Sequence, residues 1–317
     1  MRLQKISAAL AVLAIAASLS AAQAADKVRV AVATVYVPFA PIFVAQELGF
    51  YKEMDLEVEA TVYRGGGPAQ EAMAAGAADI LTNSPMGAAL AISKGIKQKV
   101  VAAGGTVTPG GWYIVVRKDS GIKSMKDLDG KKVGVTGKGS TTDFFALWAA
   151  KNAGITVQTI PLGGNGLLPA IKNSQVDAIV LWPTFSFRAL KDSALTDLVD
   201  LGKVMPPVVP DSVVASQEMI DKRPDVLKRY LQALMKAVDY MQKHEDYTKK
   251  FLAKYANESD PDVLDRAYRE VMMEVHTDAM VKPEWIKTSL GLMQLLSSDP
   301  TPPVEAVFTD KFLPVKQ

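Results

Sequence analysis

Gly65–Pro85 reads GGGPAQEAMAAGAADILTNSP, and Gly163–Pro183, 98 residues later, reads GGNGLLPAIKNSQVDAIVLWP. Each stretch passes from a glycine-rich turn through a short helical pattern to an aspartate, an apolar run and a proline. A short apolar run bounded by turn signals is typical of a buried strand. The repeat is longer than the period of about 20–50 residues seen in solenoids, so it predicts two similar α/β lobes.

The segments upstream of both stretches follow the same plan. Strands are predicted at 28–34 and 56–63, separated by a helix at 39–48. In the second copy a strand is predicted at 132–136, followed by a helix at 143–153. Strands that alternate with helices predict, in each lobe, a mostly parallel sheet flanked by helices.

Two segments are predicted to carry the chain between the lobes. An apolar strand at 112–116 follows a stretch rich in Gly, Thr and Pro, and a second crossing near 206–216 begins in a proline-rich stretch. We therefore expect a hinge, with residues 25–111 and 212–317 forming the first lobe and residues 112–211 the second. The helical pattern near the C-terminus is expected to pack back on the first lobe.

The N-terminus has the features of a secretory signal. Arg2 and Lys5 precede an uncharged stretch at 6–20 and the small-residue motif Ala22–Ala24. That stretch of about fifteen residues is shorter than the roughly 20 that a membrane-spanning helix needs. We expect residues 1–24 to be removed by cleavage after Ala24 and the remaining chain to reside in the periplasm.

Composition excludes several classes of site. The chain has no cysteine and only two histidines, which excludes disulfides and thiolate chemistry and argues against a histidine metal cluster. Without Arg2 and Lys5, the 36 Lys and Arg become 34, equal to the 34 Asp and Glu, so no nucleic-acid surface is indicated. No catalytic constellation is evident. We expect a monomeric binding protein without catalytic residues, metal or cofactor.

The candidate ligand-binding residues come from loops at the carboxyl ends of the predicted strands. Ligands bind at this edge of open α/β sheets, and helix N-termini there favour anions. Because equivalent loops are selected in both lobes, they can face one cleft. The candidates are Tyr36, Pro38, Phe39, Arg64, Gly66, Gly67, Asn83 and Ser84 in the first lobe, and Trp112, Gly139, Ser140, Thr141, Thr142, Asn165 and Trp182 at the hinge and in the second.

The loop 137–142 (GKGSTT) is the strongest of these candidates. Its glycines permit close backbone approach, and its hydroxyls and helix-start amides donate hydrogen bonds to oxygens. A P-loop would place Lys directly after the second spaced glycine, but Ser140 follows Gly139, so nucleotide hydrolysis is disfavoured. The alternative is an ordinary helix cap supplied by Thr141 or Thr142.

The other candidates also have structural alternatives. The glycines at 65–67 suit either ligand contact or a tight turn with positive φ. Arg64 is either a solvated charge or the cation that holds an acidic headgroup by a forked hydrogen bond. The aromatic candidates suit the apolar walls of a small-molecule pocket, and the alternative for Trp112 is packing at the hinge.

The chain resembles the substrate-binding proteins of ABC transporters, in particular the sulfonate-, taurine- and nitrate-binding and thiamine-precursor-related group. The resemblance runs through 41–51 (PIFVAQELGFY), the glycines at 65–67, 128–135 (LDGKKVGV) and 140–142 (STT). It implies a two-lobed periplasmic binding protein fold of type II with a two-stranded hinge. It also implies capture of a small solute by lobe closure and delivery to a membrane permease with its cytoplasmic ATPase.

The resemblance supports the class of protein, a solute-binding protein, more strongly than it identifies the ligand. Sulfonate or carboxylate anions, taurine-like among them, rank first, because helix-start amides suit the headgroup and aromatic side chains suit the body. A pyrimidine or thiamine precursor also suits the aromatics. The rival classes are a related thiamine-precursor enzyme, disfavoured by the absent cysteine and the export signal, and a periplasmic sensory partner.

Overall fold

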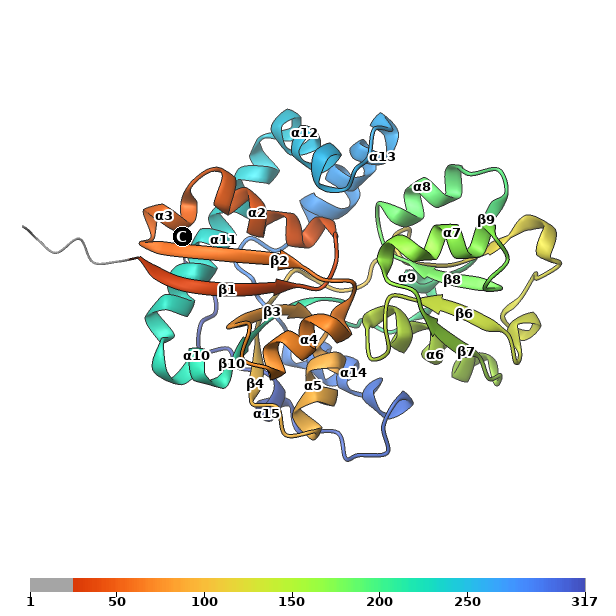
Figure 1. Ribbon diagram of the computed structural model, residues 1–317, viewed down its shortest axis with the longest axis horizontal. Helices are drawn as coiled ribbons and strands as arrows, with labels where there is room; N and C mark the ends of the chain where they lie inside the picture. The colour runs from red at the N-terminus through yellow and green to blue at the C-terminus, as the bar shows by residue number, and fades with distance from the viewer. Residues whose placement is uncertain (1–24, 317) are drawn as a thin grey trace, which may run out of the picture.

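The computed structural model describes residues 25–316 and contains two five-stranded sheets, drawn on the left and right of Figure 1. The predicted signal segment 1–24 and its cleavage site lie outside the described residues. The first sheet has the order β2-β1-β3-β10-β4 and the second β7-β6-β8-β5-β9. The strands of the first sheet are β1 (Asp26–Val32), β2 (Leu56–Val62), β3 (Ile80–Asn83), β4 (Gln98–Ala103) and β10 (Ser212–Ser216); those of the second are β5 (Tyr113–Arg117), β6 (Lys132–Val135), β7 (Gln158–Pro161), β8 (Ala178–Leu181) and β9 (Leu195–Asp200).

The two sheets have the same topology. β1 pairs in parallel with β2 and β3, and β6 pairs in parallel with β7 and β8. One strand in each sheet, β10 or β5, is antiparallel to both of its neighbours. The predicted α/β class is therefore confirmed. Each sheet is mixed because it contains one antiparallel strand, which is the first strand in sequence after the chain crosses from the other sheet.

The internal repeat is visible in the hydrogen bonds that join neighbouring strands. Asp79 accepts from the backbone N–H of Arg29 at 2.8 Å, and Asp177 accepts from the backbone N–H of Lys132 at 2.9 Å. In both lobes the aspartate just before the third strand therefore holds the first strand in register.

Helices flank both sheets and start close to their predicted positions. The helix predicted at 143–153 starts at Thr141, and the one predicted from Pro68 starts two residues earlier, at Gly66. In the first sheet's unit they are η1 (Val37–Phe39), α2 (Ala40–Glu47), α3 (Phe50–Glu53), α4 (Gly66–Ala74) and α5 (Pro85–Ser93); in the second they are η2 (Lys118–Ser120), η3 (Met125–Leu128), α6 (Thr141–Ala153), η4 (Gly164–Gly166), α7 (Leu167–Lys172), α8 (Phe185–Lys191) and α9 (Leu201–Val204).

The C-terminal region is helical and lies mainly against the first sheet's unit (Figure 1). Its longest helix, α11, begins at Pro224 and buries one apolar stripe against α2 and α3, while α14 and α15 contact α5. The elements are α10 (Gln217–Lys222), α11 (Pro224–Lys243), α12 (Glu245–Tyr255), α13 (Pro261–Arg266), η5 (Ala267–Val271), η6 (Met272–Glu274), α14 (Pro283–Leu290), η7 (Met293–Leu295) and α15 (Val304–Val307).

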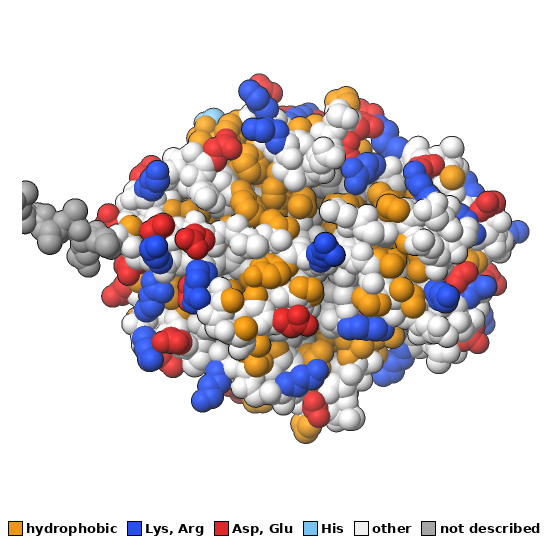
Figure 2. Space-filling view, in the orientation of Figure 1, with side chains coloured by type: hydrophobic (Ala, Val, Ile, Leu, Met, Phe, Trp, Pro, Cys, Tyr) orange, Lys and Arg blue, Asp and Glu red, His pale blue; other side chains and the backbone are white. Residues whose placement is uncertain are grey.

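The surface agrees with the balanced composition. Figure 2 shows basic and acidic side chains intermixed around the visible face, with hydrophobic side chains nearer its centre. Within residues 25–316, no helix has both the length and the apolar character that crossing a membrane requires.

The chain passes from one sheet to the other twice, at 104–112 and at 201–211. The strands that follow, β5 and β10, lie wholly within the sheets. The two crossings are joined by a hydrogen bond of 2.9 Å from the Val107 N–H to the Val208 carbonyl. We propose that they form the hinge between a first lobe of 25–111 with 212–317 and a second lobe of 112–211.

The paired aspartates predict unequal effects on stability. Asp79 also accepts from the Arg29 guanidinium at 2.7 and 3.2 Å, whereas the nearest cationic nitrogen to Asp177 is the Lys131 Nζ at 4.0 Å. Because hydrogen bonds to charged groups contribute more, Asp79→Ala should cost about 1–3 kcal/mol and Asp177→Ala about 0.5–1.5 kcal/mol. Urea denaturation of both variants measures this. Equal losses, or a larger loss for Asp177→Ala, would contradict it.

Candidate functional site

A pocket lies between the two lobes, at the carboxyl ends of the strands. Ten of the fifteen predicted residues line it: Tyr36, Phe39, Gly66, Asn83, Ser84, Trp112, Ser140, Thr141, Thr142 and Trp182. The remaining lining residues are not among those fifteen: Ala33, Thr34, Gly65, Thr136, Pro210 and Asp211. Its volume is about 40 Å³.

Three helices begin at this pocket, namely α4, α5 and α6. Ser84 caps α5 by accepting from the Gly87 N–H at 3.2 Å, and Ser140 caps α6 by accepting from the Asp143 N–H at 3.4 Å. At the start of α4, a Cβ on Gly66 would lie 2.8 Å from Asn83 Oδ1, so only glycine fits there. Free N–H groups and the positive ends of helix dipoles favour an anion in the pocket.

The hydroxyls of the second lobe form a connected group. Thr142 Oγ1 lies 2.9 Å from Ser140 Oγ and 3.0 Å from Thr136 Oγ1, and it accepts from the Thr136 N–H at 2.9 Å. Thr141 Oγ1 instead donates to the Pro210 carbonyl at 2.8 Å, which ties α6 to the second crossing. The predicted cap at Thr141 or Thr142 is wrong: Ser140 caps the helix, because α6 starts earlier than predicted.

The lysine of loop 137–142 points away from the pocket. Lys138 Nζ donates to the Thr159 carbonyl on β7 at 2.7 Å and also contacts Thr159 Oγ1. Among the described residues, no Lys or Arg lines the pocket. An anion there would be held by backbone amides and hydroxyls, as at a helix N-terminus, and not by a cationic side chain.

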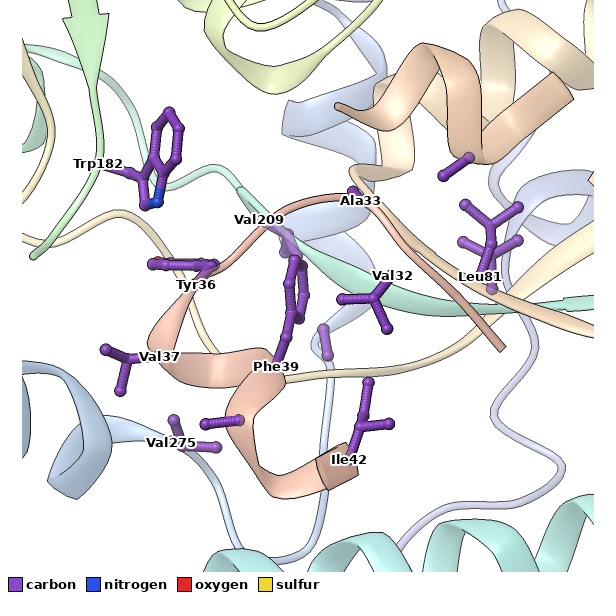
Figure 3. Close-up of a cluster of buried hydrophobic side chains, with 14 of the residues drawn as sticks. Val32, Ala33, Tyr36, Val37, Phe39, Ile42, Leu81, Trp182, Val209 and Val275 are labelled. Atoms are coloured by element: carbon purple, nitrogen blue, oxygen red, sulfur yellow. The ribbon is translucent and has the colours of Figure 1, made fainter. Parts of the chain in front are cut away.

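Aromatic side chains form the other wall of the pocket. The Tyr36 ring packs edge-on against Phe39 at 5.4 Å and against Trp112 at 5.9 Å. Figure 3 shows Tyr36 and Phe39 on the segment after β1, with Trp182 on a separate element facing them. Trp182 Nε1 donates to the Val35 carbonyl at 3.1 Å, and this bond joins the lobes. Trp112 borders the pocket and also packs on Phe145 of α6 at 5.0 Å.

The glycine-rich turns of the repeat meet the opposite lobes. A Cβ on Gly65 would lie 3.2 Å from the Thr136 carbonyl oxygen, just after β6. Reciprocally, a Cβ on Gly164 would lie 3.1 Å from Thr34 Oγ1, just after β1, and 3.1 Å from the Trp182 ring. Each turn therefore packs against the end of the other lobe's first strand, which explains why both copies carry glycine.

Five predicted residues lie outside the pocket. Arg64 and Asn165 are exposed, in keeping with the solvated alternative for Arg64. Gly67 and Gly139 line a surface groove between α4, α5 and loop 137–142. Pro38 lines a second cavity described below. All of them except Asn165 are adjacent in sequence to a pocket residue.

Asp211 is the main residue that sequence reasoning missed. It lies at the end of the second crossing, is 6% exposed, and borders the pocket. Burial raises the pKa of its carboxyl to about 7. Burial and the nearby Asp211 carboxylate also raise the pKa of Tyr36 well above its usual value. The available sequence signal was position alone: Asp211 directly follows the proline-rich stretch at the predicted hinge.

Ion pairs join the second lobe to the C-terminal helices. Lys191 at the end of α8 pairs with Asp260 and, at 3.1 Å, with Asp262. Arg188 lies 3.7 Å from the buried Glu258 carboxylate. Figure 1 shows α13 facing α8 across the gap between the lobes. Exposed pairs of this kind contribute little individually, so they align the lobes more than they hold them together.

Comparison with known proteins shows a matching family and a matching fold. The family model described as "NMT1/THI5 like" matches residues 37–247. A binding protein of Brucella abortus (strain 2308) is 27% identical over 218 residues, which cover 66% of this chain and 66% of that protein, just under two thirds of its length. A Bacillus subtilis (strain 168) protein named for aliphatic sulfonate binding is 26% identical over 216 residues, covering 65% of this chain and 63% of that protein.

The fold likeness covers most of the chain. The alkanesulfonate-binding protein SsuA from Xanthomonas axonopodis pv. citri, bound to MOPS, superimposes with a TM-score of 0.73 at 17% identity. The match covers 89% of this chain and 98% of that one. At this identity the likeness carries the fold alone, and the predicted two-lobed α/β fold of periplasmic binding proteins is confirmed.

The raised pKa of Asp211 predicts a pH-dependent effect of Asp211→Asn. Between about pH 4 and pH 7 the folded protein keeps a proton that the unfolded chain releases, so this carboxyl's contribution to stability falls as pH rises. Asparagine does not ionise. Relative to wild type, the free energy of unfolding of Asp211→Asn should rise by about 2 kcal/mol between pH 5 and pH 8, measured by urea denaturation. A difference that is the same at both pH values would contradict this.

Proposed function

Because this chain belongs to the NMT1/THI5-like family, we propose that it is an extracytoplasmic solute-binding protein of an ABC importer. Its solute is a small organic anion, a sulfonate or carboxylate with taurine-like compounds included, held between the lobes and delivered to a membrane permease with its cytoplasmic ATPase. The N-terminal signal features support export to the periplasm with cleavage after Ala24.

The observation that carries this proposal is the composition of the pocket. Three helix N-termini and the hydroxyls of Ser140 and Thr142 offer hydrogen bonds suited to an oxyanion, with no basic side chain beside them. The rings of Tyr36, Trp112 and Trp182 offer apolar contact that a bare inorganic anion such as nitrate would not use. An organic body attached to an anionic headgroup uses both walls.

Lobe closure is the mechanism that the contacts support. The pocket walls belong to both lobes, and the Trp182–Val35 hydrogen bond forms only when the lobes meet. A solute that touches both walls binds the closed form better than an open one, so it shifts the population toward closure. A permease that recognises the closed form then receives loaded protein preferentially.

A second candidate ligand class is a flat heterocycle such as a pyrimidine. The aromatic wall and the Asp211 carboxyl favour it, since a ring amine would donate to the carboxyl. An enzyme that makes such a compound is a weaker alternative, because the sequence combines an export signal with the absence of cysteine. A periplasmic sensory partner would use the same pocket and dock on a receptor instead.

A ligand screen tests this proposal. Residues 25–317 are unfolded and refolded to remove carried-over solute and then scanned by thermal shift with sulfonates, carboxylates, nitrate and pyrimidines. A ligand at about one hundred times its Kd adds ~2.7 kcal/mol of stability, so a selective rise in Tm with organic anions is expected. Consumption of the bound compound, or a response to pyrimidines alone, would contradict the proposal.

Two variants test whether the ligand found in the screen binds in this pocket. Ser140→Ala removes a hydroxyl at the start of α6, and because hydrogen bonds to charged groups contribute most, affinity should fall roughly 10-fold to 100-fold by calorimetry. Arg64→Ala is the matched control, because Arg64 is exposed and outside the pocket, and its affinity should change less than about twofold. A larger loss for Arg64→Ala would reverse the assignment.

Gly164→Ala tests closure itself. The added Cβ would lie 3.1 Å from Thr34 Oγ1 of the first lobe, which it meets only when the lobes are closed, and 3.1 Å from the Trp182 ring of its own lobe. We expect at least a tenfold loss of affinity with little change in the melting temperature of the empty protein. Small-angle scattering with ligand should show a larger radius of gyration than for wild type. Unchanged affinity would exclude tight closure at this contact.

A further inference from the structure

The short helix α8 joins the pocket to the C-terminal helices. It begins directly after Trp182–Thr184, and its first residue, Phe185, packs on the Trp182 ring with the centroids 4.6 Å apart. Its last turn carries Arg188 and Lys191, which face the acidic segment 258–262 of the first lobe. One helix of the second lobe therefore contacts the solute pocket at one end and the opposite lobe at the other (Figure 1).

The ion pair of Arg188 with Glu258 is buried, unlike the pairs that Lys191 makes. The Glu258 side chain is 5% exposed, whereas the Lys191 side chain is 45% exposed. Glu258 Oε1 accepts from the N–H groups of Ser259 and Asp260 at 2.8 and 2.9 Å, so the carboxylate is fixed to the first lobe. A fixed charge with little access to water depends on its partner cation far more than an exposed charge does.

This pair is not yet at hydrogen-bond distance. Arg188 Nη1 lies 3.7 Å from Glu258 Oε2, whereas hydrogen bonds between charged groups are about 2.7–2.9 Å long. Within residues 25–316, neither Glu258 Oε2 nor the buried Arg188 Nε has a hydrogen-bond partner. Buried polar atoms without partners cost free energy, and these two belong to opposite lobes. The pair therefore draws the lobes toward a slightly tighter closure.

Arg266 makes a second contact with α8. Its Cζ lies 3.8 Å from the centroid of the Phe187 ring, and its Nη2 donates to the Gly110 carbonyl of the first crossing at 3.3 Å. Glu270 accepts from the same guanidinium at 2.8 and 2.9 Å and holds it in this position. Phe187 is buried, and a cation attracts an aromatic face more strongly where water is excluded.

A second cavity lies beside these contacts. Its volume is about 130 Å³, and it is enclosed by the first crossing, Pro38, Pro183 and Phe187 and the C-terminal segment 270–276. The lobes are therefore not packed continuously on this side of the molecule. Because a cavity contributes no packing attraction, the contacts of α8 with segment 258–266 supply much of the attraction between the lobes here.

These contacts do not need a solute. Arg188, Glu258 and Arg266 all lie outside the pocket, and each contact joins the second lobe to the C-terminal part of the first. Contacts that are made only in the closed form raise the population of that form, whether or not a ligand is present. A solute would then bind more tightly, because more of the protein is already closed when it arrives.

We propose that α8 and segment 258–266 form a latch between the lobes, so that the closed form is populated in the empty protein. The Arg188–Glu258 pair is its main attraction, Arg266 on Phe187 supports it, and the exposed Lys191 pairs align it. This inference rests on the hinge motion of the proposed function, but it does not depend on which solute is bound.

Single-molecule energy transfer on the empty protein tests the latch. The chain has no cysteine, so Ala75→Cys at the end of α4 and Asn152→Cys on α6, both exposed, direct one dye to each lobe. Residues 25–317, refolded to remove solute, should show a closed and an open population. Glu258→Gln should lower the closed-to-open ratio at least tenfold, because Arg188 is left without its partner. Glutamine keeps an acceptor for the two backbone N–H groups, so the segment should stay folded.

Matched variants assign the effect to the buried pair. Lys191→Gln removes a cation from the same helix, but its pairs are exposed, so the closed-to-open ratio should change less than about threefold. Arg188→Gln should resemble Glu258→Gln. The double variant should lie closer to wild type than either single variant, because neither charge is then left without a partner. Losses that multiply in the double variant would show that the two residues act independently and would overturn the pairing.

The outcomes separate the latch from the proposed function. An empty wild-type protein that is entirely open would overturn the latch, and a selective thermal-shift response to organic anions would still support solute binding. A closed-to-open ratio that Glu258→Gln leaves unchanged would also overturn it. A single population in wild type and in every variant, with or without the compounds of the screen, would overturn both the latch and closure by a hinge.

Discussion

The lobes approach each other through backbone, and the rest of the site depends on that close approach. At Gly65 and Gly164 a Cβ atom would lie 3.1–3.2 Å from atoms of the opposite lobe, closer than ordinary packing allows. The same glycine turns lie beside the pocket. Short contacts between the lobes therefore leave little room for water, and in such an environment helix-start amides and hydroxyls act on a ligand more strongly than they would in solvent.

The site recognises charge without an ion pair supplied by a basic side chain. Its donors are backbone amides and hydroxyls already fixed by helix caps and by one another, so few side chains need to be ordered when ligand arrives. Asp211 differs from these groups, because nothing in residues 25–316 satisfies it. The pocket thus has pre-positioned hydrogen-bond donors on one side and, among the described residues, a carboxyl without a hydrogen-bond partner on the other.

Much of the fold could be predicted because the residues that recur in the two copies have strict backbone requirements. The aspartates at 79 and 177 and the glycines of both turns occupy equivalent positions, so equivalent loops could be selected in the two lobes. Ten of the fifteen candidate residues chosen from these loops line the pocket. Arg64 and Asn165 lie outside the pocket, because the turns approach the other lobe through backbone and the neighbouring side chains face solvent. Asp211 belongs to no motif, and its burial arises only when the second crossing is folded between two cavities.

The reciprocal contact of each glycine turn with the other lobe's first strand has the form of an isologous dimer interface made within one chain. Two separate copies of such a lobe would have to overcome the loss of translational freedom each time they met. Here the two hydrogen-bonded crossings tether them, so the effective concentration of one lobe at the other is high. A contact surface too weak to join two separate copies is therefore sufficient to close the tethered lobes. The same weakness allows the lobes to open again.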